Sequence, residues 1–264
     1  MNLLRTDHPV ALITGAASGI GRATADVFAA AGYRVLIVDI DEGAGLEVTQ
    51  ALQSAGASAD FVLADVGDAA QVARAVARAA ERWGRLDFVF NNAGIVGRRS
   101  PIEQLDEADL DRVIAVNLKA PFYFCKHAFP LLACAGGGSV LNISSITAQK
   151  GSPHYAAYSA TKAGVVALTR SLARSSGRRN IRVNCIVAGS VGGTSLMRGE
   201  DAGASRSPAD ERARTVAMIK GIPLGRPAAA RDVAHLALFL ASPMARHIHG
   251  ATLTIDGGEL RGSS

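Results

Sequence analysis

Cysteine and histidine are scarce in this chain. The three cysteines, Cys125, Cys134 and Cys185, are odd in number and show no C-x-x-C spacing, which argues against a disulfide framework or a cysteine zinc site. Each lies in an apolar run, where a buried reduced thiol is ordinary. His247 and His249 are close together but have no third ligand nearby in the sequence, so no metal site is predicted.

Long hydrophobic runs are absent as well. No stretch has the length of a transmembrane helix, and the opening residues, MNLLRTDHPV, contain no apolar segment of signal-peptide length. We therefore expect a cytoplasmic protein without a membrane partner, in which residues 1–9 form an N-terminal extension.

Aromatic residues make up 5% of the chain and hydrophobic residues 48%, which suits an α/β protein packed with Ala, Val and Leu. The net charge of +5 raises the question of nucleic acid binding. The arginines are scattered over predicted helix faces, apart from Arg178, Arg179 and Arg182, and there is no aromatic interleaving and no helix-turn-helix pattern. The basic charge is interpreted as a solvated surface, and no nucleic acid partner is predicted.

Apolar runs of strand length alternate with helical patterns from Val10 onwards, without an internal domain linker. This alternation predicts one α/β domain over residues 1–264, a Rossmann-type doubly wound fold with a seven-stranded parallel sheet and helices on both faces. Residues 190–222 are glycine-rich and charged in their first half, and we expect them to form a substrate loop.

A glycine-rich turn separates the first predicted strand from the first predicted helix. Its glycines follow the spacing G-x-x-x-G-x-G, which lets the backbone approach a pyrophosphate while the helix N-terminus faces the negative charge. Such a turn alone could be a tight connection, but its place between a strand and a helix favours dinucleotide binding. The predicted cofactor residues of the turn are Gly15, Ser18, Gly19, Ile20 and Gly21.

Polar residues and glycine mark the ends of the next three predicted strands. Asp39 lies 18 residues beyond Gly21, close to the distance at which an acid bonds the adenosine ribose hydroxyls of NAD. Because the 2′-phosphate of NADP would meet that carboxylate, NAD is the predicted cofactor. The cofactor residues predicted from the strand ends are Asp39, Asp65 and Val66, with the last two beside the adenine, and Asn91, Ala93 and Gly94.

A tyrosine and a lysine one helical turn apart carry the predicted chemistry. Tyr158 precedes Lys162 by four residues, which places ammonium and phenol on one helix face. A phenol with a pKa of about 10 is a poor base at neutral pH, but a close cation favours the phenolate. Ser145 closes an apolar strand upstream, where its hydroxyl would meet a ligand crevice. The rival phenol, Tyr155, is two turns from Lys162 and too far for strong coupling.

An asparagine within a predicted helix also calls for an explanation. A helical pattern runs from Asp106 towards Leu118, and Asn117 within it does not favour the helix itself. Pro121 and Pro130 are expected to limit or bend the helix in the residues after Leu118.

The segments TGAASGIG at 14–21, NNAG at 91–94 and YSATK at 158–162, together with Asn117 and Ser145, make the chain resemble the short-chain dehydrogenase/reductase family over nearly its whole length. These signatures are specific in combination, although each alone is weak.

The resemblance implies a role for each of four residues. Tyr158 would be the general acid/base, and Ser145 would hydrogen-bond the substrate oxygen. Lys162 would lower the pKa of Tyr158 and bind the nicotinamide ribose, while Asn117 would hold a water that relays protons to Lys162.

The resemblance also implies a homotetramer, with interfaces formed by the helices after Glu107 and Tyr155 and by the last strand. Two departures concern the sixth strand. Ala188-Gly189 stands where such proteins read Pro-Gly, and residues 191–194 hold one residue more than the usual Val-x-Thr spacing. No contact of this loop with the nicotinamide is therefore assigned.

The sequence predicts an NAD(H)-dependent oxidoreductase acting on a small-molecule secondary alcohol or ketone. One alternative is a reductase of a carrier-bound 3-ketoacyl group, which would use Arg178 and Arg179 to dock an acidic partner. Another is a regulatory protein that binds NAD(H) without turnover. The complete set of Asn117, Ser145, Tyr158 and Lys162 favours the enzyme, because a sensor would not need all four.

Overall fold

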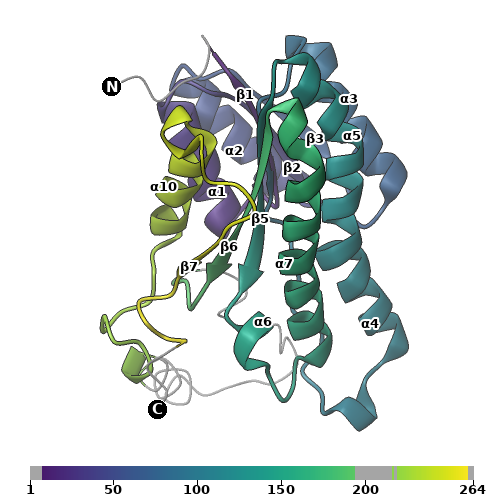
Figure 1. Cartoon of the computed structure of the whole chain (residues 1–264), viewed down its shortest axis with the longest axis vertical. Coiled ribbons are helices and arrows are strands. Elements are labelled where there is room, and N and C mark those ends of the chain that lie inside the picture. Colours follow the sequence, from purple (N-terminus) through teal and green to yellow (C-terminus); the bar gives the residue numbers. More distant parts are fainter. Residues whose placement is uncertain (1–7, 194–215, 217–218, 261–264) are drawn as a thin grey trace.

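The computed structural model describes residues 8–193, 216 and 219–260. Its parallel strands form a seven-stranded sheet in the order β3-β2-β1-β4-β5-β6-β7 (Figure 1). The strands are β1 (Val10–Thr14), β2 (Arg34–Asp39), β3 (Ala59–Leu63), β4 (Phe88–Asn91), β5 (Gly138–Ser145), β6 (Ile181–Ala188) and β7 (Thr252–Ile255). The strand order reverses between β1 and β4, which opens a crevice at the carboxyl ends of the strands. The predicted fold is confirmed.

Helices cover both faces of the sheet, as Figure 1 shows. One layer contains α1 (Gly19–Ala30), α2 (Glu42–Ser54) and α10 (Ala230–Ala241), and the other contains α3 (Ala69–Trp83), α4 (Glu107–Ile114), α5 (Ala120–Cys134) and α7 (Ala156–Ser176). Alternate residues of β1 pack against the two helix layers, because successive side chains of a strand point to opposite faces of the sheet. Ala11 and Ile13 pack towards α1 and α10, while Val10 and Leu12 pack towards α3 and α5.

Aspartates begin several helices and fix the loops that face the crevice. Asp68 accepts hydrogen bonds from the backbone N–H groups of Ala70 (2.8 Å) and Gln71 (3.2 Å) at the start of α3. Asp106 caps α4 in the same way. Such a cap satisfies backbone donors that have no partner within the helix. Gly84 ends α3 with φ +71°, in the left-handed region.

The helical segment around Asn117 differs from the prediction. α4 passes through a single π-helical turn, Ala115–Lys119, directly into α5. Pro121 and Pro130 therefore do not limit the helix, which continues through both. Pro121 lies in the first turn of α5, where a missing N–H is tolerated, and the wider π turn just before it changes the bonding register, with the Ala120 N–H donating to the Ala115 carbonyl.

Two predicted segments fall largely outside the described residues. They are the N-terminal extension, of which only residues 8 and 9 are described, and the substrate loop, of which residues 194–215 and 217–218 are not. Within the described part, no helix is both long enough and apolar enough to span a membrane.

Candidate active site

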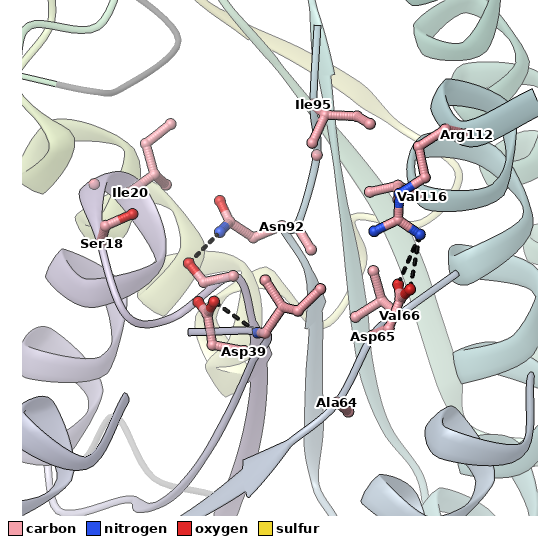
Figure 2. A pocket seen from close by; sticks show the side chains of 15 residues that line it. Ser18, Ile20, Asp39, Ala64, Asp65, Val66, Asn92, Ile95, Arg112 and Val116 are labelled. Carbon is pink, nitrogen blue, oxygen red and sulfur yellow. Dashed lines mark hydrogen bonds and ion pairs between the residues drawn. The ribbon is translucent and has the colours of Figure 1, made fainter. Parts of the chain in front are cut away.

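A cavity lies at the switch point of the sheet, lined by strand ends and by the glycine turn (Figure 2). Of the predicted cofactor residues, nine line it: Gly15, Ser18, Gly19, Ile20, Asp39, Asp65, Val66, Ala93 and Gly94. The structure adds Ile40, Ala64, Asn92, Ile95, Arg112 and Val116. The sequence segments that predicted a dinucleotide site thus meet at one place.

The glycine turn packs closely against the end of β4. Gly15 has φ +61°, which disfavours any side chain. Gly21 does not line the cavity. A Cβ at Gly21 would overlap the carbonyl oxygen of Gly15 and lie 2.7 Å from Nδ2 of Asn92. Gly21 therefore allows α1 to approach the turn. The N-terminus of α1 faces the cavity, where the helix dipole favours an anion.

The Asp39 carboxylate is held at the cavity wall by backbone donors. Oδ2 accepts from the Ala17 N–H (2.8 Å), and Oδ1 accepts from the N–H groups of Ile40 (2.8 Å) and Asp41 (3.1 Å). These bonds fix its orientation where the glycine turn meets the end of β2. A carboxylate held in this way is prepared to accept hydrogen bonds from a ligand's hydroxyl groups.

The neighbouring asparagines Asn91 and Asn92 have different surroundings. The Asn92 amide lines the cavity and donates to the carbonyl oxygens of Thr14 (2.8 Å) and Gly15 (3.2 Å), joining β4 to the glycine turn. The Asn91 amide is 5% exposed and donates to Oδ1 of Asn142 within the core (2.7 Å). The structure thus brings Asn92 to the site and leaves the predicted Asn91 behind the wall.

A second cavity adjoins the first and contains Ser145, Tyr158 and Lys162. The two cavities share Ile20, Asn92 and Gly94. Ser145 ends β5, and Tyr158 lies in the first turn of α7, so the strand end and the helix start face each other. The Ser145 hydroxyl hydrogen-bonds Tyr158, and Nζ of Lys162 lies 5.6 Å from the centre of the Tyr158 ring.

Burial is the main influence on the acidity of this pair. It lowers the pKa of Lys162 to about 8, although the nearby Cys185 opposes the change. It also raises the pKa of Tyr158, which the Ser145 hydrogen bond lowers in part. The prediction that the pKa of Tyr158 is lowered is therefore wrong for the protein without a bound ligand. Desolvation of the phenolate raises this pKa more than the Ser145 hydrogen bond lowers it.

Lys162 is only 4% exposed, and its ammonium donates to the carbonyl of Ile143 (3.2 Å). Asn117 is 1% exposed and lies just outside the cavities. Its amide bonds the backbone of Ile95 in both directions, accepting at 2.8 Å and donating at 2.7 Å. A Cβ added to Gly94 would lie 3.2 Å from both Asn117 Oδ1 and Lys162 Nζ. Gly94 thus lets the two polar groups lie against the backbone; the water relay between them stays a prediction.

The chain after β6, where the sequence departs from the pattern of the family that it resembles, is held by a carboxylate. Glu259 accepts from the Ser190 N–H (2.8 Å) and pairs with Lys150 of the short helix α6 (Thr147–Lys150) at 3.4 Å. Gly189 and Ser190 line the second cavity. The carboxylate therefore fixes the backbone at Ser190, two residues beyond Ala188, the position where the resemblance leads us to expect proline.

The remaining polar groups show no metal cluster within the described residues. Cys125 and Cys185 are buried, and burial raises the pKa of each thiol to about 12. Cys134 is exposed at the end of α5, although its apolar neighbours predicted burial, because the last turn of a helix can turn one face to solvent.

Comparisons with known proteins identify the family of this chain. A family model described as enoyl-(acyl carrier protein) reductase matches residues 15–259. A cis-4-hydroxycyclohexanecarboxylate dehydrogenase of Sinomonas cyclohexanicum is 42% identical over 249 residues, covering 94% of this chain and 95% of that protein.

Two crystal structures are similar over almost their full length. A levodione reductase superposes with a TM-score of 0.90 and 34% identity, covering 97% of this chain and 98% of that one. An NAD⁺-bound xylitol dehydrogenase gives a TM-score of 0.89 and 28% identity, covering 97% of this chain and 100% of that one. The chain belongs to the short-chain dehydrogenase/reductase family and is an oxidoreductase.

Proposed function

We propose that this protein is an NAD(H)-dependent oxidoreductase that interconverts a small secondary alcohol and a ketone by hydride transfer. The observation that carries the proposal is the meeting of Ser145, Tyr158 and Lys162 in a cavity that shares lining residues with the dinucleotide crevice. A proton-transfer group and a cofactor cavity side by side are what alcohol oxidation requires.

The proposed roles follow from the contacts of each side chain. The nicotinamide ring, when bound, supplies the hydride acceptor or donor. Tyr158 takes the hydroxyl proton of the alcohol, or gives one to the ketone oxygen, while Ser145 donates a hydrogen bond to that oxygen. With a pKa of about 8, Lys162 is largely protonated at pH 7. Its positive charge favours the Tyr158 phenolate, against the effect of burial.

Asp39 supports NAD rather than NADP. The 2′-phosphate of NADP would bring negative charge close to the Asp39 carboxylate. Two like unit charges about 4 Å apart repel by about 4 kcal/mol at an effective dielectric near 20. Solvent at the rim of the cavity reduces this repulsion. Arg22, the cation that could offset the repulsion, is exposed and does not line the cavity. Arg112 does line it, but pairs with Asp65 at 2.8 Å.

Turnover of a panel of secondary alcohols with NAD, followed by NADH absorbance, tests the proposal. Tyr158→Phe removes the transferable proton, so we expect turnover to fall about 100-fold or more while NAD affinity is kept. Tyr155→Phe is the matched control, since Tyr155 lines a different pocket, and it should keep its activity. Lys162→Met should impair both binding and turnover.

Three results would contradict the proposal in different ways. Near-normal turnover by Tyr158→Phe would remove Tyr158 as the acid/base. Turnover of a carrier-bound 3-ketoacyl thioester, with none of the panel, would favour the carrier-protein reductase. Tight NAD binding without turnover of either substrate class would favour a regulatory protein.

A further inference from the structure

An ion pair between Arg112 and Asp65 forms part of the wall of the first cavity (Figure 2). Arg112 lies on α4 and Asp65 follows β3, 47 residues earlier in the chain. Nη1 of Arg112 donates to both carboxylate oxygens, at 3.0 and 2.8 Å. The side chains are 42% and 29% exposed, so each keeps contact with the solvent of the open cavity.

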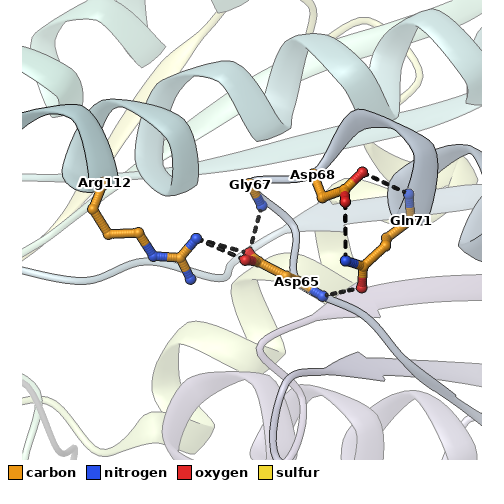
Figure 3. Close-up of polar contacts among 5 residues, drawn as sticks. All are labelled: Asp65, Gly67, Asp68, Gln71 and Arg112. Atoms are coloured by element: carbon orange, nitrogen blue, oxygen red, sulfur yellow. Dashed lines mark hydrogen bonds and ion pairs between the residues drawn. The ribbon is translucent and has the colours of Figure 1, made fainter. Parts of the chain in front are cut away.

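Asp65 is also held by its own loop, as Figure 3 shows. Its carboxylate accepts from the Gly67 N–H (2.8 Å), and its backbone N–H donates to Oε1 of Gln71 (2.9 Å). The Gln71 amide in turn donates to Asp68, the capping residue of α3 (3.1 Å). The carboxylate consequently has a fixed position, and Arg112, on the same wall of the cavity, reaches it from α4.

The two acidic residues of the cavity, Asp39 and Asp65, lie on opposite walls. In Figure 2, Asp39 lies beside the glycine turn, while Arg112, Asp65 and Val66 form the opposite wall. Without Arg112, two carboxylates would face a dinucleotide whose pyrophosphate is itself negative. Within the described part of the chain, the hydrogen bonds of the Arg112 side chain all come from Nη1, and the side chain is 42% exposed at the cavity, so the guanidinium can still meet a ligand.

We propose that Arg112 is a binding residue for the adenine of the cofactor. It neutralises Asp65 and offers a planar cation to the purine face, an arrangement that favours aromatic rings. Arg112 therefore contributes to affinity for the adenosine half of the dinucleotide and little to affinity for the nicotinamide half. This inference rests on the proposed use of a nicotinamide dinucleotide.

A purely structural role would give a different result. In that role the ion pair only ties α4 to the end of β3, and its loss would lower stability without favouring one half of the ligand. The chain offers a matched control in Arg78 and Asp60, another pair between a helix and the β3 region. Its distance is also 2.8 Å, its side chains are 44% and 21% exposed, and neither residue lines the cavity.

The test measures each half of the cofactor separately. ADP-ribose binding is followed by calorimetry, and the weaker binding of nicotinamide mononucleotide by ligand-observed NMR. Arg112→Met should raise the Kd for ADP-ribose about 3- to 10-fold, the range expected for an exposed ion pair plus a cation–π contact. The Kd for nicotinamide mononucleotide should stay within about twofold. Arg112→Lys keeps the charge but not the planar group. Its Kd for ADP-ribose should lie between those of wild type and Arg112→Met.

Arg78→Met should lower the melting temperature about as much as Arg112→Met and leave both Kd values unchanged. Equal weakening of both probes by Arg112→Met, or weakening of neither, would overturn the adenine role while leaving the dinucleotide site intact. If wild type bound neither probe, the proposed function would fail together with this inference. Should Arg112→Met not fold, an ADP-ribose affinity of Arg112→Lys equal to wild type would overturn the role of the guanidinium plane.

Discussion

Asp39 is the residue on which the choice of cofactor depends. Its carboxylate is fixed by three backbone donors, so a 2′-phosphate cannot push it aside without breaking those bonds. Asp39→Ala should therefore weaken NAD binding and relax the discrimination against NADP. Calorimetry with both cofactors measures the two effects.

The control for this prediction is Asp41→Asn. Asp41 caps α2 by accepting from the Ala44 N–H (3.0 Å) and does not line the cavity. Removing its charge while keeping an acceptor should leave the ratio of the two Kd values unchanged. Comparable Kd values for NAD and NADP in the unmutated protein would contradict the assignment of Asp39.

Lys162 links the chemistry to the pH dependence of stability. Its pKa is about 8 in the folded protein against an ordinary value of 10.5, so the unfolded chain binds more protons between these values. The free energy of unfolding therefore rises with pH in this window through Lys162. Below pH 8 the buried charge costs about 3 kcal/mol, at about 1.4 kcal/mol for each pH unit between the two pKa values.

Lys162→Met removes this buried charge and should thus be more stable than wild type at pH 7. The gain in the free energy of unfolding is reduced by about 1 kcal/mol, because the Ile143 carbonyl loses its hydrogen-bond donor. Its advantage should shrink by about 1 kcal/mol between pH 8 and 9. Urea unfolding of both proteins at pH 7, 8 and 9 measures the difference. Both proteins keep the same cysteines, so thiol ionisation largely cancels. A difference that stays constant over this range would show that Lys162 is not destabilised by burial.

Strand periodicity could have separated Asn91 from Asn92 in advance. Consecutive residues at a strand end point to opposite sides, so only one of the two amides can face the glycine turn. Arg112 had no such local signal. Its partner Asp65 lies 47 residues away, and a contact of that kind depends on how α4 is placed over the sheet.

Local patterns predicted the helices and strands, and long-range packing set the details. Apolar runs followed by glycine or aspartate identified the strands and helix ends. The expectation from the prolines was wrong: Pro121 follows closely after a turn without regular α-helical bonding, and Pro130 lies inside α5, which continues through it. The π turn at Ala115–Lys119 lets α4 and α5 continue as one rod and also sets the position of Asn117. The short helix α6 had no periodic pattern long enough to detect.

Helices α5 and α7 expose apolar side chains around a groove. Phe122 of α5 is 50% exposed, beside a groove lined by Phe129 and by Leu172 of α7. α7 is one of the helices expected to form interfaces in a homotetramer, and α5 directly continues the other, α4, through the π turn. The homotetramer stays a prediction, as does the cytoplasmic location.

Light scattering should give a mass of four times the 27.2 kDa chain. Phe122→Glu should lower that mass, because burying an unpaired carboxylate at an interface is costly. Leu46→Glu, on the opposite helix layer and 44% exposed, should leave the mass unchanged. A monomeric wild type would contradict the predicted tetramer.

Gly94 has a consequence for how this chain can diverge. Its backbone does not require glycine through a positive φ, and a methyl group there would lie 3.2 Å from Asn117 Oδ1 and Lys162 Nζ, so small shifts of those groups would accommodate it. The fold would therefore tolerate alanine at this position, while the Lys162 ammonium and the Asn117 amide would be displaced from the places they hold against the backbone.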